Sequence, residues 1–218
     1  MKLIDELRAE HELIERVLGS LRTWVETRVS GALDPRDGEA FVRFFSEFSG
    51  SFHHGREENV LLPALVAHAE LRAKSGPVVA LIDQHRSMEA TFEEMAPLLL
   101  AEPLAPSQKE ALVDLATRYS RALWQHIDAE SSVLLPESEN RLARAMVREL
   151  PAREMTPGEA EAKAEGERLV RTYPQAYDPG AIRGEGCVIC PSHGVTCEGV
   201  EREWWNDWEW ESFGRGQE

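Results

Sequence analysis

Two stretches of this chain repeat one another, and each places a histidine and a glutamate one helical turn apart. The first is HHGREENVLLP, which begins at His53, and the second is HIDAESSVLLP, which begins at His126. Aligned on VLLP, the two stretches superpose Glu57 on Glu130. Residues four apart lie on one face of an α-helix, so each stretch directs an imidazole and a carboxylate the same way. The repeat therefore predicts two similar helices that present polar side chains to a common interior.

The rest of the first 150 residues has the pattern of long amphipathic helices. Apolar residues recur in steps of three and four, which is typical of a helix with one buried face. Helices are expected over residues 2–29, 36–68 and 77–99 and, after a capping box formed by Ser107 and Glu110, from residue 107 onward. No part of this region alternates with a period of two. Residues 1–150 are therefore predicted to form an all-α, up-down-up-down antiparallel four-helix bundle.

Residues 151–218 differ in character and are expected to form a mostly irregular C-terminal extension. Thr156 and Glu159 have the spacing of a helix cap and predict a short helix that ends at about Thr172. Prolines and glycines are frequent beyond it and favour irregular backbone.

A single interior histidine on each of the other two bundle helices completes the repeat. His11 and His85 occupy positions in the apolar rows of the first and third helices. Each half of the bundle is thus a hairpin in which one histidine faces a His-x-x-x-Glu pair. A lone histidine, or a lone pair of this kind, is ordinary in a core or on a helix surface. The agreement of the two halves in residue type, spacing and phase favours a metal site instead.

Burying several imidazoles and two carboxylates in an apolar bundle is costly without a compensating positive charge. Imidazole combined with carboxylate suits iron, zinc, copper or nickel rather than magnesium or calcium. Carboxylates from opposite halves that each bridge two metals would create a dinuclear centre. His54 adjoins His53 and is a further candidate, and a His54–Glu58 pair is an alternative to His53–Glu57. The predicted ligands are His11, His53, His54, Glu57, His85, His126 and Glu130.

Through His11, His85 and the two repeated stretches, residues 1–150 resemble the hemerythrin-like (HHE cation-binding) domain, a four-helix bundle that holds non-heme iron. The resemblance implies a di-iron centre, oxo- or hydroxo-bridged, with histidine ligands and bridging glutamates. Members of the family bind dioxygen, sense oxygen or redox state, handle iron, respond to nitric oxide or decompose peroxide. The doublet His53–His54 resembles the bacterial branch. Respiratory oxygen carriers have more histidines in the third helix, so the resemblance does not favour simple oxygen transport.

Two functions follow from this site. One is a non-enzymatic protein that binds or senses dioxygen, nitric oxide or redox state. The other is a di-iron oxidase or a peroxide-decomposing enzyme, with the C-terminal tail covering the site. No general acid or base is identified beside the ligands. Tyr119 lies less than two turns before His126 and is close enough to reach the site, although a core tyrosine is more often a packing residue.

Charge and hydropathy exclude several partners. The net charge of −15 disfavours binding to nucleic acid or to an anionic membrane surface. The chain has no apolar leader and no apolar run of about 18 residues, so we expect a cytoplasmic protein without a membrane span.

A second candidate metal site lies in the extension. Cys187, Cys190, His193 and Cys197 fall within eleven residues, close to the spacing of compact zinc-binding loops. A structural zinc would supply folding free energy to a segment with little core. A redox-active cysteine pair, an iron–sulfur cluster and three unrelated cysteines are the alternatives.

Four tryptophans stand among acidic residues near the end of the chain. They are Trp204, Trp205, Trp208 and Trp210. Exposed indole rings at this density would form an adhesive patch. We expect them either to fold back onto the bundle, covering one end of the metal site, or to dock on a partner protein.

Overall fold

The computed structural model describes residues 1–30 and 36–177 of the chain. The cluster of Cys187, Cys190, His193 and Cys197 and the tryptophan-rich segment therefore lie outside the described residues, and their predicted roles stay predictions.

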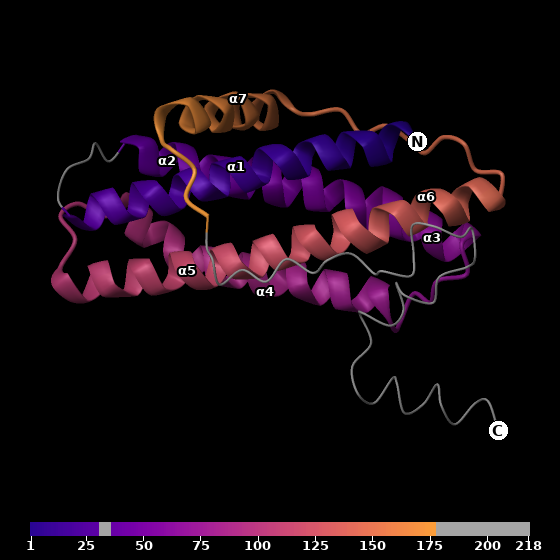
Figure 1. Cartoon of the computed structure of the whole chain (residues 1–218), viewed down its shortest axis with the longest axis horizontal. Helices are drawn as coiled ribbons and strands as arrows, with labels where there is room; N and C mark the ends of the chain where they lie inside the picture. Colours follow the sequence, from indigo (N-terminus) through magenta and orange to yellow (C-terminus); the bar gives the residue numbers. More distant parts are fainter. Residues whose placement is uncertain (31–35, 178–218) are drawn as a thin grey trace, which may run out of the picture.

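Four long helical segments run antiparallel in the order up, down, up, down (Figure 1). They are α1 (Lys2–Ser30), then α2 (Arg36–Arg43) with η1 (Phe44–His54), η2 (Glu57–Leu61) and α3 (Leu62–His68), then α4 (Pro77–Leu100), and last α5 (Pro106–Ala129) with η3 (Glu130–Leu134) and α6 (Leu135–Arg144). No strand occurs in the described part of the chain. The all-α bundle is thus confirmed. Within the same residues, none of the helices has both the length and the apolar character that a membrane span requires.

The second and fourth segments switch from α-helical to π-helical geometry around the repeated stretches. The π-helical segments η1, η2 and η3 include His53, His54, Glu57 and Glu130. Such wider turns are rare and occur mainly at functional sites. A wider turn rotates the chain less per residue, so the side chains of adjacent residues point in more similar directions. This geometry allows the neighbouring imidazoles of His53 and His54 to face the same interior.

The start of the fourth segment differs from its expected position. Helix α5 begins at Pro106, and the side chain of Gln108 accepts a hydrogen bond from the backbone N–H of Ala105 at 2.9 Å. The capping box expected at Ser107 and Glu110 is therefore wrong. Proline suits the first helical position because its fixed φ is already helical and its missing N–H would have no partner there.

A further helix, α7 (Pro157–Thr172), packs along the outside of the bundle over α1 and α2 (Figure 1). Its capping box is the predicted one: the Glu159 N–H donates to Thr156 Oγ1 at 3.3 Å, and the Thr156 N–H donates to Glu159 Oε2 at 2.7 Å. Gly166 faces the ring of Phe44, where a Cβ atom would come within 2.3 Å of the ring. Glycine at this position therefore allows α7 to pack closely against η1.

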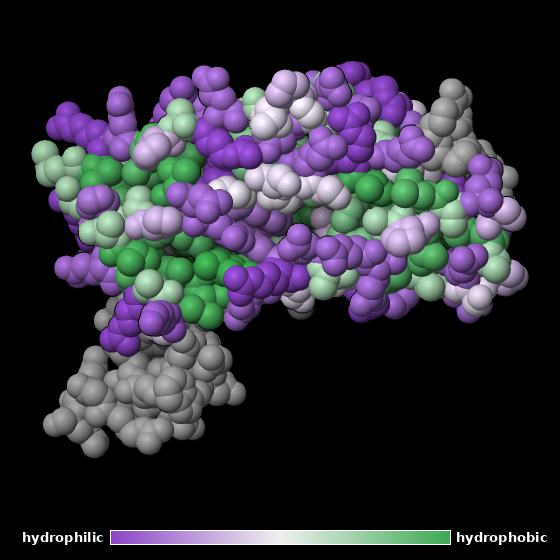
Figure 2. Space-filling view, turned by 180° about the vertical axis from the view of Figure 1, so that it is seen from behind, coloured by the Kyte–Doolittle hydropathy of each residue, from purple (hydrophilic) through white to green (hydrophobic). Residues whose placement is uncertain are grey.

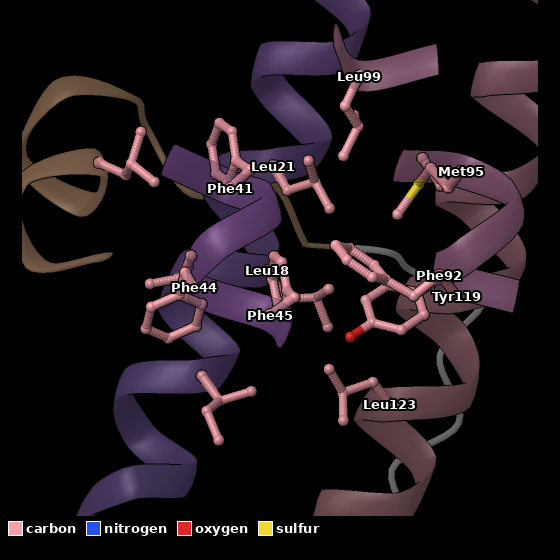
Figure 3. Packing of buried hydrophobic residues seen from close by; sticks show 14 of the residues in the cluster. Leu18, Leu21, Phe41, Phe44, Phe45, Phe92, Met95, Leu99, Tyr119 and Leu123 are labelled. Carbon is pink, nitrogen blue, oxygen red and sulfur yellow. The ribbon is translucent and has the colours of Figure 1, made fainter. Parts of the chain in front are cut away.

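The buried apolar residues form two clusters that occupy different parts of the bundle. The larger cluster joins α1, η1, α4, α5 and α7, and Figure 3 shows the rings of Phe45, Phe92 and Tyr119 meeting within it. The smaller cluster joins the start of α1 with α3, α6 and the start of α4. Along α4, for example, Leu81 belongs to the smaller cluster and Met88 to the larger one. On the first three long segments the predicted ligands fall between residues of the two clusters, and on the fourth segment Glu130 does.

The outer surface mixes polar and apolar side chains. Figure 2 shows hydrophilic residues over much of one face, with hydrophobic residues gathered toward the two ends of the bundle. Single exposed apolar residues are normal on a protein surface and define no site.

Candidate metal centre

The structure brings the seven predicted ligands together in the layer between the two apolar clusters. They form two sets, and within each set the potential ligand atoms lie within 4.8 Å of one another. The first set contains His54, Glu57, His85 and His126, and the second contains His11, His53, Glu57 and Glu130. All four long helical segments contribute, as the repeat predicted.

Glu57 belongs to both sets, with one carboxylate oxygen facing each. Its Oε1 lies 3.5 Å from His53 Nε2 and 3.7 Å from His11 Nε2, whereas its Oε2 lies 3.5 Å from His85 Nε2. Glu130 also faces both halves, since its Oε2 lies 3.1 Å from His11 Nε2 and 3.3 Å from His126 Nε2. Each of these carboxylates therefore lies beside imidazoles of both ligand sets.

Four of the five imidazoles are oriented by a hydrogen bond at Nδ1. In the histidines of the repeated stretches, Nδ1–H donates to the residue that precedes the lone histidine of the same hairpin. The bonds are His53 to Glu10 Oε2 at 2.9 Å and His126 to Gln84 Oε1 at 2.9 Å. A donated Nδ1–H leaves Nε2 unprotonated and available to a metal.

The two lone histidines are oriented in the same way across the hairpins. His85 Nδ1–H donates to Glu58 Oε1 at 2.7 Å, and His11 Nδ1 lies 2.8 Å from Ser131 Oγ. Glu58 and Ser131 each follow the glutamate of a repeated stretch. The internal symmetry of the chain thus extends from the ligands to the groups that orient them.

Arg56 forms ion pairs with the carboxylates behind His53. Its guanidinium is 3 % exposed and pairs with the carboxylates of Glu10 and Glu6. The positive charge of Arg56 compensates Glu10, which in turn accepts from His53. A buried carboxylate without such a partner would be expensive.

Most of the inner atoms of the centre have no hydrogen-bond partners. The exceptions are Nε2 of His85 and Nε2 of His126, which lie 3.0 Å from each other. Nε2 of His11, His53 and His54 and both carboxylate oxygens of Glu57 and Glu130 are buried and unpaired. Most buried polar groups in a folded protein are paired, so a cluster of unpaired atoms requires an explanation. A cation held among them removes the cost, and their imidazole and carboxylate chemistry fits a transition metal.

The pKa values of the imidazoles are shifted in different directions. Burial and the neighbouring His85 lower the pKa of His54 and of His126 well below the usual range, so both are neutral. Burial alone would lower the pKa of His11, but the nearby carboxylates of Glu130 and Glu57 outweigh this effect and raise the pKa to about 10. Neutral imidazole is the form that binds metal.

The pKa values of the two central carboxylates, Glu57 and Glu130, are also shifted in opposite directions. Burial would raise the pKa of Glu57, but the imidazoles of His53 and His11 hold it well below the ordinary value. Burial and the negative charge of Glu57 raise the pKa of Glu130. Two carboxylates this close repel when both are ionised, and a bound cation relieves that repulsion.

Residues 2–138 match the family described as Hemerythrin HHE cation binding domain. The chain belongs to this family. No curated protein and no solved structure matches the chain. The family and the His/Glu cluster together identify residues 2–138 as a metal-binding helical domain.

A cavity of about 460 Å³ adjoins the three-imidazole half of the hemerythrin HHE domain. Both His54 and His85 line it, as does Tyr119. In Figure 3 the Tyr119 hydroxyl points toward Leu123. Leu123 lies between Tyr119 and His126 along α5. Tyr119 is therefore a wall of the cavity next to the centre.

Sequence reasoning missed the groups that orient the imidazoles. Glu10, Gln84 and Ser131 adjoin predicted ligands along the chain, and this adjacency in both hairpins is the signal that identifies them. Glu58, the alternative to Glu57, belongs to neither ligand set and contacts His85 from outside. His68 is exposed at the end of α3, away from the centre.

Proposed function

We propose that this chain is a non-heme di-iron protein that binds or senses dioxygen, nitric oxide or redox state. The observation that supports the proposal best is the pair of ligand sets that share Glu57. With one oxygen facing each set, the Glu57 carboxylate would offer one donor to each of two adjacent metal ions. Iron, when bound, supplies redox chemistry and a coordination position for a small ligand.

The chain's own residues would divide the work. The five imidazoles are neutral donors when bound to metal, and Glu57 and Glu130 supply the negative charge that balances the cations. Fewer carboxylates are present than in ferritin-like di-iron enzymes, whose sites are rich in glutamate. Less negative charge stabilises high-valent iron less, which favours binding or sensing over hydroxylation.

The two ligand sets differ in their number of imidazole donors. The set with His54, His85 and His126 has three imidazoles, whereas the set with His11 and His53 has two. We infer that the two-imidazole half is the half that accepts a small external ligand.

Metal analysis and spectroscopy test this function directly. The full chain, purified with iron, should contain two iron ions per chain. Its absorption spectrum should change when dioxygen, nitric oxide or peroxide is added. Reversible bands with dioxygen support binding. A bundle that retains only zinc would overturn the iron proposal while leaving metal binding intact, and a bundle that retains no metal would overturn both.

An enzyme is the second candidate, and the cavity beside the centre is the observation that favours it. A diatomic ligand needs far less than about 460 Å³, a volume typical of sites for small organic molecules. Catalytic consumption of peroxide, or oxidation of an organic compound with dioxygen uptake, would distinguish an oxidase or peroxide-decomposing enzyme from a sensor.

The extension remains a separate proposal. We propose a second, structural metal at Cys187, Cys190, His193 and Cys197, with zinc the expected ion, and a tryptophan-rich tail that covers the iron centre. Zinc analysis of the full chain and of its Cys190→Ser variant tests the structural metal site. Deletion of residues 180–218 should change ligand-binding rates at the iron, and unchanged rates and stability would count against the covering tail.

A further inference from the structure

The cavity beside the metal centre has chemistry that the proposed function does not use. It opens between η1 and α4, and its buried wall is apolar, with Phe45, Met88 and Phe92 each no more than 6 % exposed. A cavity of about 460 Å³ has room for the body of a small organic molecule.

Apart from His54 and His85, the charged residues that line the cavity are all acidic. Three carboxylates line it, those of Glu58, Glu89 and Glu93, and no lysine or arginine does. Glu58 is engaged with His85, whereas Glu89 and Glu93 are exposed and have no ion-pair partner among the described residues. The mouth of the cavity therefore has uncompensated negative charge.

Aromatic rings add to the attraction for a cation. The rings of Phe45, Phe92 and Tyr119 lie with their centroids 5.1–5.6 Å apart and form one continuous wall. Ring faces attract organic cations as well as apolar groups. An apolar body with an attached ammonium group matches both the wall and the acidic mouth.

A polar group in the cavity wall independently indicates a ligand. Tyr119 is 4 % exposed and lines the cavity, and its hydroxyl has no hydrogen-bond partner among the described residues. Burial raises its pKa, so the hydroxyl remains a neutral donor. A core tyrosine usually satisfies its hydroxyl, and a bound molecule would do so here.

We propose that this cavity binds a small organic amine, with its apolar body against Phe45 and Phe92 and its ammonium group at Glu89 and Glu93. The amine lies on the three-imidazole side of the centre, away from the half that accepts a small ligand. None of these contacts involves a metal, so the site exists independently of the iron proposal. Contact through Glu58 and His85 would connect its occupancy to the centre.

Calorimetric titration of the full chain with three probes of similar shape tests the proposal. Benzylamine supplies a ring with a cation, benzyl alcohol a neutral equivalent, and benzoate an anion. We expect benzylamine to bind about tenfold or more tightly than benzyl alcohol, benzoate not to bind, and added salt to weaken benzylamine binding.

Matched variants locate the site. The double variant Glu89→Gln/Glu93→Gln should reduce benzylamine affinity about tenfold and leave benzyl alcohol unaffected. Glu94→Gln is the control, because Glu94 is an exposed neighbour on α4 that does not line the cavity. An equal loss in the control would indicate only the general acidic field and would overturn the proposal, as would equal affinity for all three probes or no binding at all.

Iron content and spectrum, measured on the same samples, separate this proposal from the proposed function. Benzylamine binding by chain that holds no iron supports the cavity and counts against the di-iron function. If the iron-loaded chain does not bind benzylamine, the result supports the di-iron function and counts against the amine site. Where both hold, we expect benzylamine to shift the iron absorption bands through Glu58 and His85.

Discussion

Glu57 has one carboxylate oxygen near His53 and the other near His85, so a single side chain serves both halves of the centre. At the residue scale this sharing makes Glu57 different from the groups that only orient an imidazole. Loss of an orienting group weakens one ligand, whereas loss of Glu57 removes a donor and a negative charge from both sets.

We therefore expect Glu57→Gln to reduce metal affinity more than Glu10→Gln does. Changes to groups behind a ligand typically cost about 10–100-fold in affinity, and Glu57→Gln should exceed that range. Competition with a chelator measures both. Glu12→Gln, an exposed change on α1, is the control. Equal effects of Glu57→Gln and Glu10→Gln would contradict a shared ligand.

Arg56 is the second residue whose loss should be large. Arg56→Met leaves the carboxylate of Glu10 buried without its cation, and breaking a buried pair from one side costs about 3–5 kcal/mol in the free energy of unfolding. Urea unfolding measures it. Lys2→Met, at the exposed partner of Glu6, should change stability by less than about 1 kcal/mol. Similar values for both variants would show that Arg56 is dispensable.

At the scale of elements, the contact between α7 and η1 positions a π-helical segment that includes two predicted ligands. Helix α7 contributes Ala162 and Leu169 to the larger apolar cluster, and Tyr173, which follows the helix, joins them there. Helix α7 therefore supports the region of the bundle from which His53 and His54 project.

Two glycines of α7 give a matched test of that contact. Gly166→Ala would place a Cβ 2.3 Å from the Phe44 ring, which overpacks the interface and should cost about 1–3 kcal/mol. Gly158→Ala meets only the end of the flexible Glu47 side chain, so the helix preference for alanine should make it neutral or stabilising. Thermal unfolding compares them, and equal midpoints would argue against close packing of α7.

The cap of α7 should make stability depend on pH. Burial would raise the pKa of Glu159, but the hydrogen bonds from Arg153 and Thr156 outweigh it and lower the pKa below the ordinary value of 4.5. A lowered folded-state pKa stabilises the fold above the unfolded value, and that stability is lost as pH falls through the folded value.

Glu159→Gln should accordingly destabilise the chain by about 1 kcal/mol near neutral pH. The difference between the variant and the parent chain should shrink as pH falls below 4.5, where the parent glutamate becomes protonated. Unfolding followed by circular dichroism over this range measures it. A difference that is constant with pH would mean that the Glu159 charge does not contribute.

At the scale of the whole molecule, a polar layer divides the apolar core into two clusters. Each cluster joins several helical segments, so each holds its part of the bundle without help from a metal. The layer between them contains the unpaired atoms of Glu57 and Glu130 and is the part that a bound cation stabilises.

Metal removal should therefore lower stability without unfolding the bundle. With metal at about 100 times its Kd, the gain is about 2.7 kcal/mol, which corresponds to roughly 5–10 °C in Tm for a chain of this size. Helicity in the far ultraviolet should be unchanged. A chain that unfolds on chelation would contradict this division of the core, and an unchanged Tm would mean that no metal binds in the layer.

Much of the centre was predictable because the decisive information is local. Within one helix, the spacing from His53 to Glu57, or from His126 to Glu130, determines that both side chains share a direction. Duplication of the spacing then identified the interior face, and the same periodicity predicted the four-helix fold.

Other features depended on contacts between segments that are distant in sequence. Spacing along a helix does not determine how one helix is rotated and shifted against the next, since packing of the two apolar clusters decides that. Only this packing turned Glu57 toward both ligand sets, placed Glu58 behind His85 rather than among the ligands, and docked α7 on η1. The cavity beside Tyr119 has the same origin, because its walls come from η1, α4 and α5 and exist only when these segments meet.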